Sequence, residues 1–323
     1  MRSILCAAIV AALGFSAAGS ARADVKVPNV IGSHMVLQRD RPVPIWGWAE
    51  PGEEVTVTLD AQKVSAKADD KGNWKVTLKA VKADGKPHTM TIEGKNKIVL
   101  EDLLIGEVWL GSGQSNMQWS INQSQKSKEY TAAADRPNVR LFNVPLVQNN
   151  SPAKDVNAKW QVSSPKTVGN FSAVLYHFGV KLQGELDVPV GLINASWGGS
   201  RIEPWIVEEK KSGGMYNGMI APVQPFALRG FTWYQGESNV GEGMKYRDKM
   251  ESLIKGWRQQ WGADLPFYHV QIAPFAGYGP GSLPPLWEAQ VASLKIPGTG
   301  MVVCTDLVDN VGDIHPGNKK PYG

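Results

Sequence analysis

One serine of this sequence stands in a glycine-containing turn that is suited to nucleophilic chemistry. Ser115 lies in the segment GSGQSNM (111–117), directly after an apolar run typical of a buried strand. A hydroxyl at the carboxyl end of a strand can attack a carbonyl carbon while nearby backbone amides stabilise the oxyanion. The segment is not the G-x-S-x-G elbow of the α/β-hydrolases, because Met117 stands where the second glycine belongs. A Gly/Ser loop is often only a turn, so the assignment of Ser115 depends on finding its base.

A serine nucleophile requires a base, and the sequence holds five histidines. His34 and His88 fall in an N-terminal region of short β-like segments. His177 lies inside a helix pattern and His269 inside a buried-strand pattern, where histidines are usually structural. By elimination, His315 is the predicted base.

Three aspartates precede His315 in the polar loop after the last strand-like run, at Asp306, Asp309 and Asp313. Each could orient an imidazole and stabilise its cation. In an extended loop Asp313 and His315 point to the same side, because side chains two residues apart share a face. Asp313 is therefore the first choice for the orienting acid, and the other two stay open.

Two further polar loops could supply donors for an oxyanion. The segment NASWGGS (194–200) follows one strand-like run and allows a close backbone amide, and YQGESN (234–239) follows the next with the side-chain amides of Gln235 and Asn239. Either loop alone could be a simple turn. In a parallel sheet, however, the carboxyl ends of the strands lie at one edge. The four loops together predict one site for acyl transfer.

The elements that would position these loops follow Asp102, where apolar strand-like runs alternate with helix-length segments. The predicted strands are 104–110, 139–144, 188–194, 230–234, 267–272 and 301–304, and the predicted helices are 171–186, 246–261 and 286–294. This alternation is typical of a parallel sheet with helices on both faces. Ligands of such sheets bind beyond the carboxyl ends of the strands.

Residues 24–102 have a different pattern of short alternating segments separated by turn residues. The predicted strands are 43–48, 55–59, 74–78 and 89–92. Apolar and polar residues alternate with period two, which indicates strands with one face packed in the core and the other exposed to solvent. The sequence therefore predicts a small all-β sandwich domain at 24–102, followed by an α/β domain at 103–323.

The first 23 residues read as a secretory signal. They combine Arg2, a short apolar stretch at 4–18 and an Ala-x-Ala pattern at 21–23, so cleavage is expected after Ala23. The stretch is shorter than the roughly 20 apolar residues of a membrane span. We expect a secreted or periplasmic protein with no membrane association after signal removal.

Charge and cysteine content exclude other classes of function. Without residues 1–23 the chain has 32 basic and 30 acidic side chains, a formal charge of +2, and no run of basic residues. This balance gives no electrostatic footprint for nucleic acid or an anionic membrane. Cys304 is then the single cysteine, so no internal disulfide is expected and a buried inert thiol is predicted.

Metal, nucleotide and glycosidase chemistry are the alternatives to a serine nucleophile. The sequence has no H-E-x-x-H, no paired cysteines, no second histidine near His315 and no calcium-loop motif, so no metal site is expected. Gly111-x-Gly113 lacks the third glycine of a dinucleotide fingerprint. A glycosidase pair of carboxylates, for instance Glu203 and Glu237, stays open.

With these residues assembled, the chain resembles the sialate O-acetylesterase family, a branch of the SGNH-type serine hydrolases. The matching motifs span nearly all the mature sequence: HMVLQR (34–39), WGW (46–48), GEVW (106–109), GQSNM (113–117), WGGS (197–200), PW (204–205), YNGM (216–219), WYQGESN (233–239) and DIHP (313–316). This ordered set is specific for the family and less so for its substrate.

The resemblance implies a flavodoxin-like three-layer fold and removal of acetyl groups from carbohydrates without a cofactor. It implies Ser115 as the nucleophile and His315 as the base. The oxyanion hole would be formed by the Ser115 amide, a glycine amide at Gly198 or Gly199, and the Gln235 side chain. Two alternatives remain, an esterase acting on acetylated xylan or xyloglucan and a glycan-binding protein without catalysis. The oligomeric state is left open.

Tryptophans near the predicted loops could stack on sugar rings. We expect Trp197 and Trp205, together with Asn239, to contact substrate, and Trp119 lies close to the same loops. Packing in the core is the alternative for each ring.

The chain departs from the family pattern in two places. SGNH hydrolases usually carry Asp-x-x-His, whereas Asp313 precedes His315 by two positions. Family members usually continue past the histidine with a closing helix, whereas this sequence stops at Gly323. Whether the sequence is a fragment stays open; a hydrolase domain truncated at its C-terminus would leave an apolar sheet face uncovered.

Overall fold

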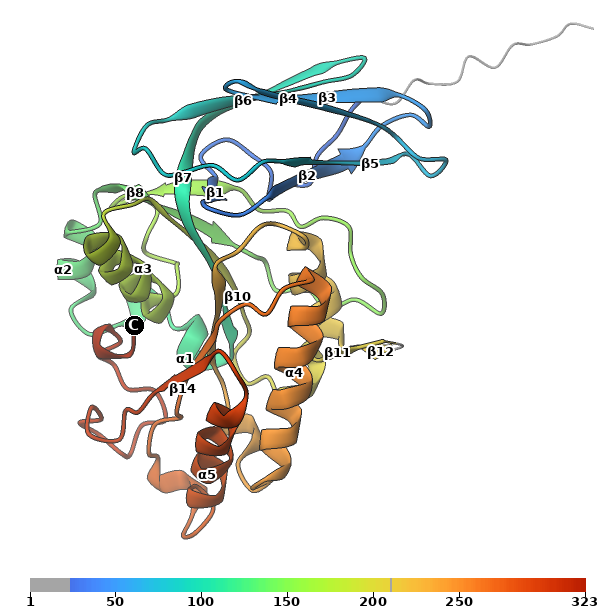
Figure 1. Ribbon diagram of the computed structural model, residues 1–323. Helices are drawn as coiled ribbons and strands as arrows, with labels where there is room; N and C mark the ends of the chain where they lie inside the picture. The colour runs from blue at the N-terminus through green and yellow to red at the C-terminus, as the bar shows by residue number, and fades with distance from the viewer. Residues whose placement is uncertain (1–23, 210) are drawn as a thin grey trace, which may run out of the picture.

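The computed structural model describes residues 24–209 and 211–323 (Figure 1). The predicted signal, residues 1–23, lies outside the described residues. None of the helices in the described ranges is long and apolar enough to cross a membrane.

The N-terminal part consists of short, mostly antiparallel strands. These are β1 (Val36–Gln38), β2 (Val43–Trp48), β3 (Glu54–Leu59), β4 (Gln62–Lys67), β5 (Asn73–Leu78) and β6 (His88–Glu93). β2 pairs with β5, and β3 pairs with both β4 and β6. Buried and half-exposed residues alternate along β2, as period-two patterning requires. The four predicted strands are confirmed, whereas β1 and β4 were not predicted.

The long strand β7 (Lys97–Gly113) joins the two parts of the molecule (Figure 1). Its first half pairs antiparallel with β6, and its second half pairs parallel with β10 and β13. The backbone changes direction at Asp102, which has a positive φ of 55° and is held by Arg140 through hydrogen bonds of 2.6 and 3.1 Å. The predicted boundary after Asp102 thus lies inside one continuous strand, not in a linker.

The main sheet has the order β15-β14-β13-β7-β10-β8-β9. Its remaining strands are β8 (Arg136–Asn143), β9 (Trp160–Ser163), β10 (Val190–Ser196), β13 (Gly230–Tyr234), β14 (Phe267–Val270) and β15 (Thr299–Val302). All neighbouring pairs along this order are parallel except β8 and β9. The predicted parallel α/β fold is confirmed, and β9 is an additional antiparallel strand at the edge.

Helices lie on both sides of this sheet, α3 on one and α4 on the other (Figure 1). The helices are α1 (Ser115–Gln118), α2 (Ser127–Ala132), α3 (Ala173–Leu186), α4 (Lys245–Trp261) and α5 (Pro284–Ala292), and a small hairpin joins β11 (Val207–Glu208) to β12 (Lys211–Ser212). The side chain of Ser172 caps α3 by accepting a hydrogen bond from the Leu175 amide. The three predicted helices are confirmed within two residues at each end.

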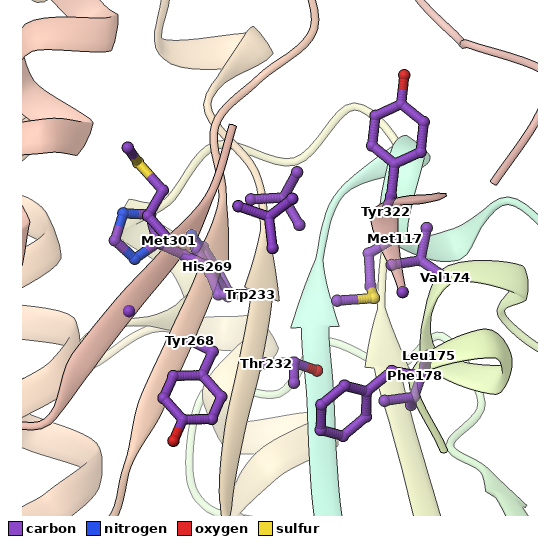
Figure 2. A pocket seen from close by; sticks show the side chains of 14 residues that line it. Met117, Val174, Leu175, Phe178, Thr232, Trp233, Tyr268, His269, Met301 and Tyr322 are labelled. Atoms are coloured by element: carbon purple, nitrogen blue, oxygen red, sulfur yellow. The ribbon is translucent and has the colours of Figure 1, made fainter. Parts of the chain in front are cut away.

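An apolar hollow of about 260 Å³ lies between α3 and the strands β13 to β15. Figure 2 shows Leu175 and Phe178 of α3 on one side of it and Tyr268 of β14 on the other. Tyr268 and Val302 are 43% and 41% exposed, so part of this sheet face is open to solvent. Neither the predicted nucleophile nor the predicted base lines this hollow.

Candidate active site

The turn that carries Ser115 is fixed by three neighbouring strand ends. The Trp197 amide donates to Gly113 O (3.0 Å), and the Gln114 amide donates to Tyr234 O (2.9 Å). Gly113 has a φ of 138°, and a Cβ there would lie 2.1 Å from Tyr234 O, so only glycine fits. The chain then enters α1 at Ser115. Strand pairing and one glycine therefore place the hydroxyl at the carboxyl edge of the sheet.

The structure brings the predicted nucleophile and base together from opposite ends of the domain. His315 Nε2 lies 2.9 Å from Ser115 Oγ, within hydrogen-bond distance. The Trp119 ring stacks on the imidazole with centroids 4.7 Å apart and 22° between the planes. The base is thus held by an aromatic side chain from the nucleophile's own segment.

Asp313 contacts His315 mainly through the backbone. Its Oδ1 accepts a hydrogen bond of 2.8 Å from the His315 amide, whereas Oδ1 and the ring Nδ1 are 3.7 Å apart. Asp309 instead accepts a hydrogen bond from Gln125. Among the three candidate aspartates, Asp313 is the one whose carboxylate lies beside the base, and it acts here as a cap on the loop.

The environment of His315 favours the neutral imidazole. Burial lowers the pKa of His315, and the positive charge of Lys319 lowers it further, while Asp313 opposes both effects. A lowered pKa leaves the ring unprotonated at neutral pH. The imidazole can therefore accept the Ser115 proton.

Of the two predicted oxyanion glycines, Gly198 is placed beside the nucleophile. A Cβ at Gly198 would lie 3.5 Å from the Ser115 Cβ, and the Gly198 amide donates to Gln118 Oε1 at 2.7 Å. Gly199 O accepts a hydrogen bond from Ser238 Oγ. Gly198 therefore lies next to Ser115, with its amide directed at the Gln118 side chain.

The predicted roles of Gln235 as an oxyanion donor and Asn239 as a substrate ligand do not fit their burial. Both side chains have no exposed surface. Gln235 Nε2 donates to Asn239 Oδ1 (2.7 Å) and Gln114 Oε1 (3.1 Å), and the Tyr246 hydroxyl donates to Gln235 Oε1. These side-chain amides connect the loops behind the site. The sequence motif does not show that the two side chains point inward.

The two predicted sugar-binding tryptophans also differ from expectation. Trp205 has no exposed surface, and its indole N–H donates to Ser200 Oγ, so it packs in the core and does not fit a substrate contact. Trp197 is partly buried against the core. A contact between Trp197 and sugar stays a prediction.

The surface beside Ser115 is a polar hollow of about 450 Å³. Its lining residues are Ser115, Gln118, Trp119, Ser120, Gln123, Asn170 and His315. Sequence reasoning did not assign Gln118, Ser120, Gln123 or Asn170 to the site. The first three could have been found because they follow the nucleophile directly in the chain. Asn170 lies on a distant loop, and no signal in the sequence links it to Ser115.

The alternative pair of glycosidase carboxylates finds no support in the geometry. Burial alone would raise the pKa of Glu203, but hydrogen bonds from Lys249 (2.5 Å) and Arg201 (3.1 Å) lower it to about 2. Glu237 is buried and bonded to Asn116. Neither carboxylate lines the hollow beside Ser115.

In the described ranges, no three His, Cys, Asp or Glu side chains are grouped in a way that could hold a metal ion. Cys304 is buried and free, and its thiol donates to Gln271 O, which agrees with the prediction of a buried thiol.

A serine hydroxyl bonded to an unprotonated imidazole, at the carboxyl edge of a parallel sheet, is the arrangement of a serine-dependent hydrolase. The family described as carbohydrate esterase, sialic acid-specific acetylesterase, matches residues 105–320. The chain belongs to this family, as the sequence resemblance predicted, and it is a carbohydrate acetylesterase similar to sialate O-acetylesterases.

Individual relatives agree with this assignment. The sialate O-acetylesterases of Mus musculus and Homo sapiens are each 30% identical over 93% of this chain, which spans 72% and 69% of their lengths. The crystal structure of XAC1771, a novel carbohydrate acetylesterase from Xanthomonas citri, is 37% identical with a TM-score of 0.86. That match covers 92% of this chain and 72% of XAC1771.

Proposed function

We propose that this chain removes O-acetyl groups from sialic acid through an acetyl-enzyme on Ser115, with His315 as the base. The observation that carries the mechanism is the 2.9 Å contact between His315 Nε2 and Ser115 Oγ. The family and the sialate O-acetylesterases that the chain resembles support sialic acid as the sugar.

The reaction needs two acyl transfers. The Ser115 proton passes to His315 Nε2 as Oγ attacks the acetyl carbon, and the tetrahedral intermediate collapses with cleavage of the bond to the sugar oxygen. That oxygen leaves with the proton from His315. A water molecule then gives its proton to His315 and attacks the acetyl-enzyme, releasing acetate and restoring Ser115.

The developing oxyanion would be stabilised by backbone amides at Ser115 and Gly198. The Gly198 amide already donates to an oxygen, Gln118 Oε1, at 2.7 Å. The ester oxygen would take the place of this amide oxygen, so Gln118 must turn away when substrate binds. Such a fixed donor in a partly buried site is worth about 3 to 4 kcal/mol of transition-state stabilisation.

The hollow beside Ser115 suits a sugar better than an apolar acyl chain. Gln118, Gln123 and Asn170, whose side chains carry amides, and Ser120, whose side chain carries a hydroxyl, are among its lining residues. Side-chain amides can both donate to and accept from sugar hydroxyls. Its volume of about 450 Å³ is within the usual range for small-ligand sites.

Acetate release tests the proposal. O-acetylated sialic acid, acetylated xylan and p-nitrophenyl acetate are compared with wild-type protein and Ser115→Ala at equal concentration of folded protein. We expect Ser115→Ala to lose activity by a factor of about 10³ or more. Ser112→Ala is the matched control, because Ser112 is buried in β7 and does not line the hollow.

The outcomes separate the alternatives. Faster acetate release from O-acetylated sialic acid supports the proposed substrate. Faster acetate release from acetylated xylan would instead indicate a plant polysaccharide as the substrate. Retained activity in folded Ser115→Ala contradicts the mechanism. No release by folded wild-type protein would favour glycan binding without catalysis.

A further inference from the structure

A chain of three buried polar side chains lies behind the nucleophile. Asn116 Nδ2 donates to Glu237 Oε1 at 2.6 Å, and the Lys319 ammonium donates to Asn116 Oδ1. Asn116 and Lys319 have no exposed surface, and Glu237 is 6% exposed. We refer to Glu237, Asn116 and Lys319 as the Glu–Asn–Lys chain.

This chain touches the segment of the base at two points. Asn116 Nδ2 also donates to Ile314 O at 3.1 Å, one residue before His315. The Lys319 ammonium lies 5.4 Å from the centre of the Trp119 ring, and that ring stacks on the His315 imidazole. The buried ammonium and the imidazole therefore contact the same indole.

Burying these groups is unfavourable for the fold by itself. A buried ammonium must give up its hydration, and an apolar side chain of similar volume would pack without that penalty. Burial lowers the pKa of Lys319 to about 7, opposed by Glu237, Asp313 and Cys304. Burial raises the pKa of Glu237, and the hydrogen bond from Asn116 opposes that rise. Packing alone therefore does not account for Lys319 and Glu237.

We propose that Lys319 and Glu237 are positioning residues that hold Asn116 and Trp119, and through them hold His315 at hydrogen-bond distance from Ser115. The proposal rests on the proposed function, in which Ser115 and His315 perform the chemistry. Neither Lys319 nor Glu237 lines the substrate hollow. Their removal should therefore slow the chemical step and leave substrate binding nearly unchanged.

The Lys319 charge gives the proposal a second, electrostatic signature. The charged groups that act on the pKa of His315 are Lys319, which lowers it, and Asp313, which raises it. From α1 and the residue after it, His315 meets the Ser115 hydroxyl and the uncharged Trp119 ring. Loss of the Lys319 charge should therefore raise the pKa of His315.

The test compares Lys319→Met with Lys320→Met. Methionine keeps the length of the side chain without its charge or donors, and Lys320 is an exposed neighbour outside the Glu–Asn–Lys chain. For Lys319→Met with p-nitrophenyl acetate we expect kcat to fall about 10- to 100-fold, as for other supporting residues, with KM within about 2-fold. The acid limb of the pH profile of kcat/KM should move to higher pH. Lys320→Met should match wild type in all three quantities.

A histidine NMR titration gives a readout that does not need activity. The His315 signal is identified by its loss in His315→Ala, and its pKa should be higher in Lys319→Met than in wild type. If the wild-type protein shows no esterase activity, the proposed function fails, and this titration still reports whether Lys319 acts on His315.

Glu237→Gln provides a second variant in case Lys319→Met does not fold. Glutamine keeps the acceptor for Asn116 but removes the charge that keeps Lys319 protonated, so the His315 pKa should shift in the same direction by a smaller amount. A kcat and a His315 pKa equal to those of Lys320→Met, in either folded variant, would overturn the proposal and leave the Glu–Asn–Lys chain with a packing role only.

Discussion

The nucleophile and the base of this site are held in place by different means. The turn before Ser115 is fixed by strand pairing, since the last seven residues of β7 pair with β10 and the last five with β13. The loop 303–319, which carries His315, contains no helix or strand. Pairing between β-strands therefore fixes the position of the nucleophile. The position of the base depends on side-chain contacts and a few isolated backbone hydrogen bonds.

The contacts of the loop 303–319 show how few backbone bonds hold it. The Ala276 amide donates to Val311 O and the Gln125 amide to Gly317 O, both at 2.8 Å. Side-chain contacts also hold the loop, among them those from Asn116 to Ile314 O, from Trp119 to the His315 ring and from Gln125 to Asp309. Changes near Ser115 should therefore affect folding, and changes near His315 should affect catalysis.

The largest expected effect is at Gly113. In Gly113→Ala the new Cβ would lie 2.1 Å from Tyr234 O, where neither backbone can yield without breaking the pairing of β7 with β13. We expect a loss of at least about 3 kcal/mol in the free energy of unfolding, together with loss of activity. Thermal unfolding measured by circular dichroism checks the stability, and should show a decrease in Tm of roughly 6 °C or more.

Gly52→Ala is the control for backbone conformation alone. Gly52 also has a positive φ, 77°, but a Cβ there would meet nothing within 4 Å. Gly52→Ala should lower the free energy of unfolding by about 1 to 2 kcal/mol, which is the strain of a non-glycine residue in the left-handed conformation. Equal stability of the two variants would show that overlap with Tyr234 O does not fix the turn.

A smaller effect is expected at Asp313. Asparagine can still accept the hydrogen bond from the His315 amide, whereas alanine cannot, so Asp313→Asn should lose less activity than Asp313→Ala. With Oδ1 and Nδ1 3.7 Å apart, the loss in Asp313→Asn should be far below the roughly 10⁴-fold effect of an acid that directly orients the imidazole. Removing the negative charge should also lower the pKa of His315 and move the acid limb of kcat/KM to lower pH.

Asp306→Asn and Asp309→Asn test whether either of the other two aspartates orients His315. Asn substitution at these positions should leave kcat/KM within about 3-fold of wild type, because in the described residues the carboxylate beside the His315 ring is that of Asp313, and Asp309 bonds to Gln125 instead. A larger loss at Asp309 than at Asp313 would move the orienting role to Asp309.

Much of the fold could be predicted from the sequence because its strands and helices carry strong periodic patterns. The predicted strands 43–48 and 230–234 match β2 and β13 residue for residue. Ser115 and His315 could be found because a glycine turn after a buried strand and a histidine in a polar loop are local features. Their meeting at one edge follows from the parallel sheet.

The rest depends on the direction of side chains, which a motif does not state. Gln235 and Asn239 are polar residues of a strand-end loop, yet both amides turn inward and bond to each other. The large apolar ring of Trp205 could stack on a sugar, but the same property makes it suitable for the core, where it lies. Lys319 gave no signal, because a lysine in a polar C-terminal segment is ordinarily solvated.

The most direct test of the central claim is covalent labelling with a fluorophosphonate, followed by intact mass measurement and peptide mapping. An activated serine reacts with such a probe only when a base assists it. We predict one label per chain on Ser115, no label in Ser115→Ala, and labelling slowed by at least about 100-fold in His315→Ala. A label on another serine, or an unlabelled but folded wild-type protein, would contradict the pairing of Ser115 with His315.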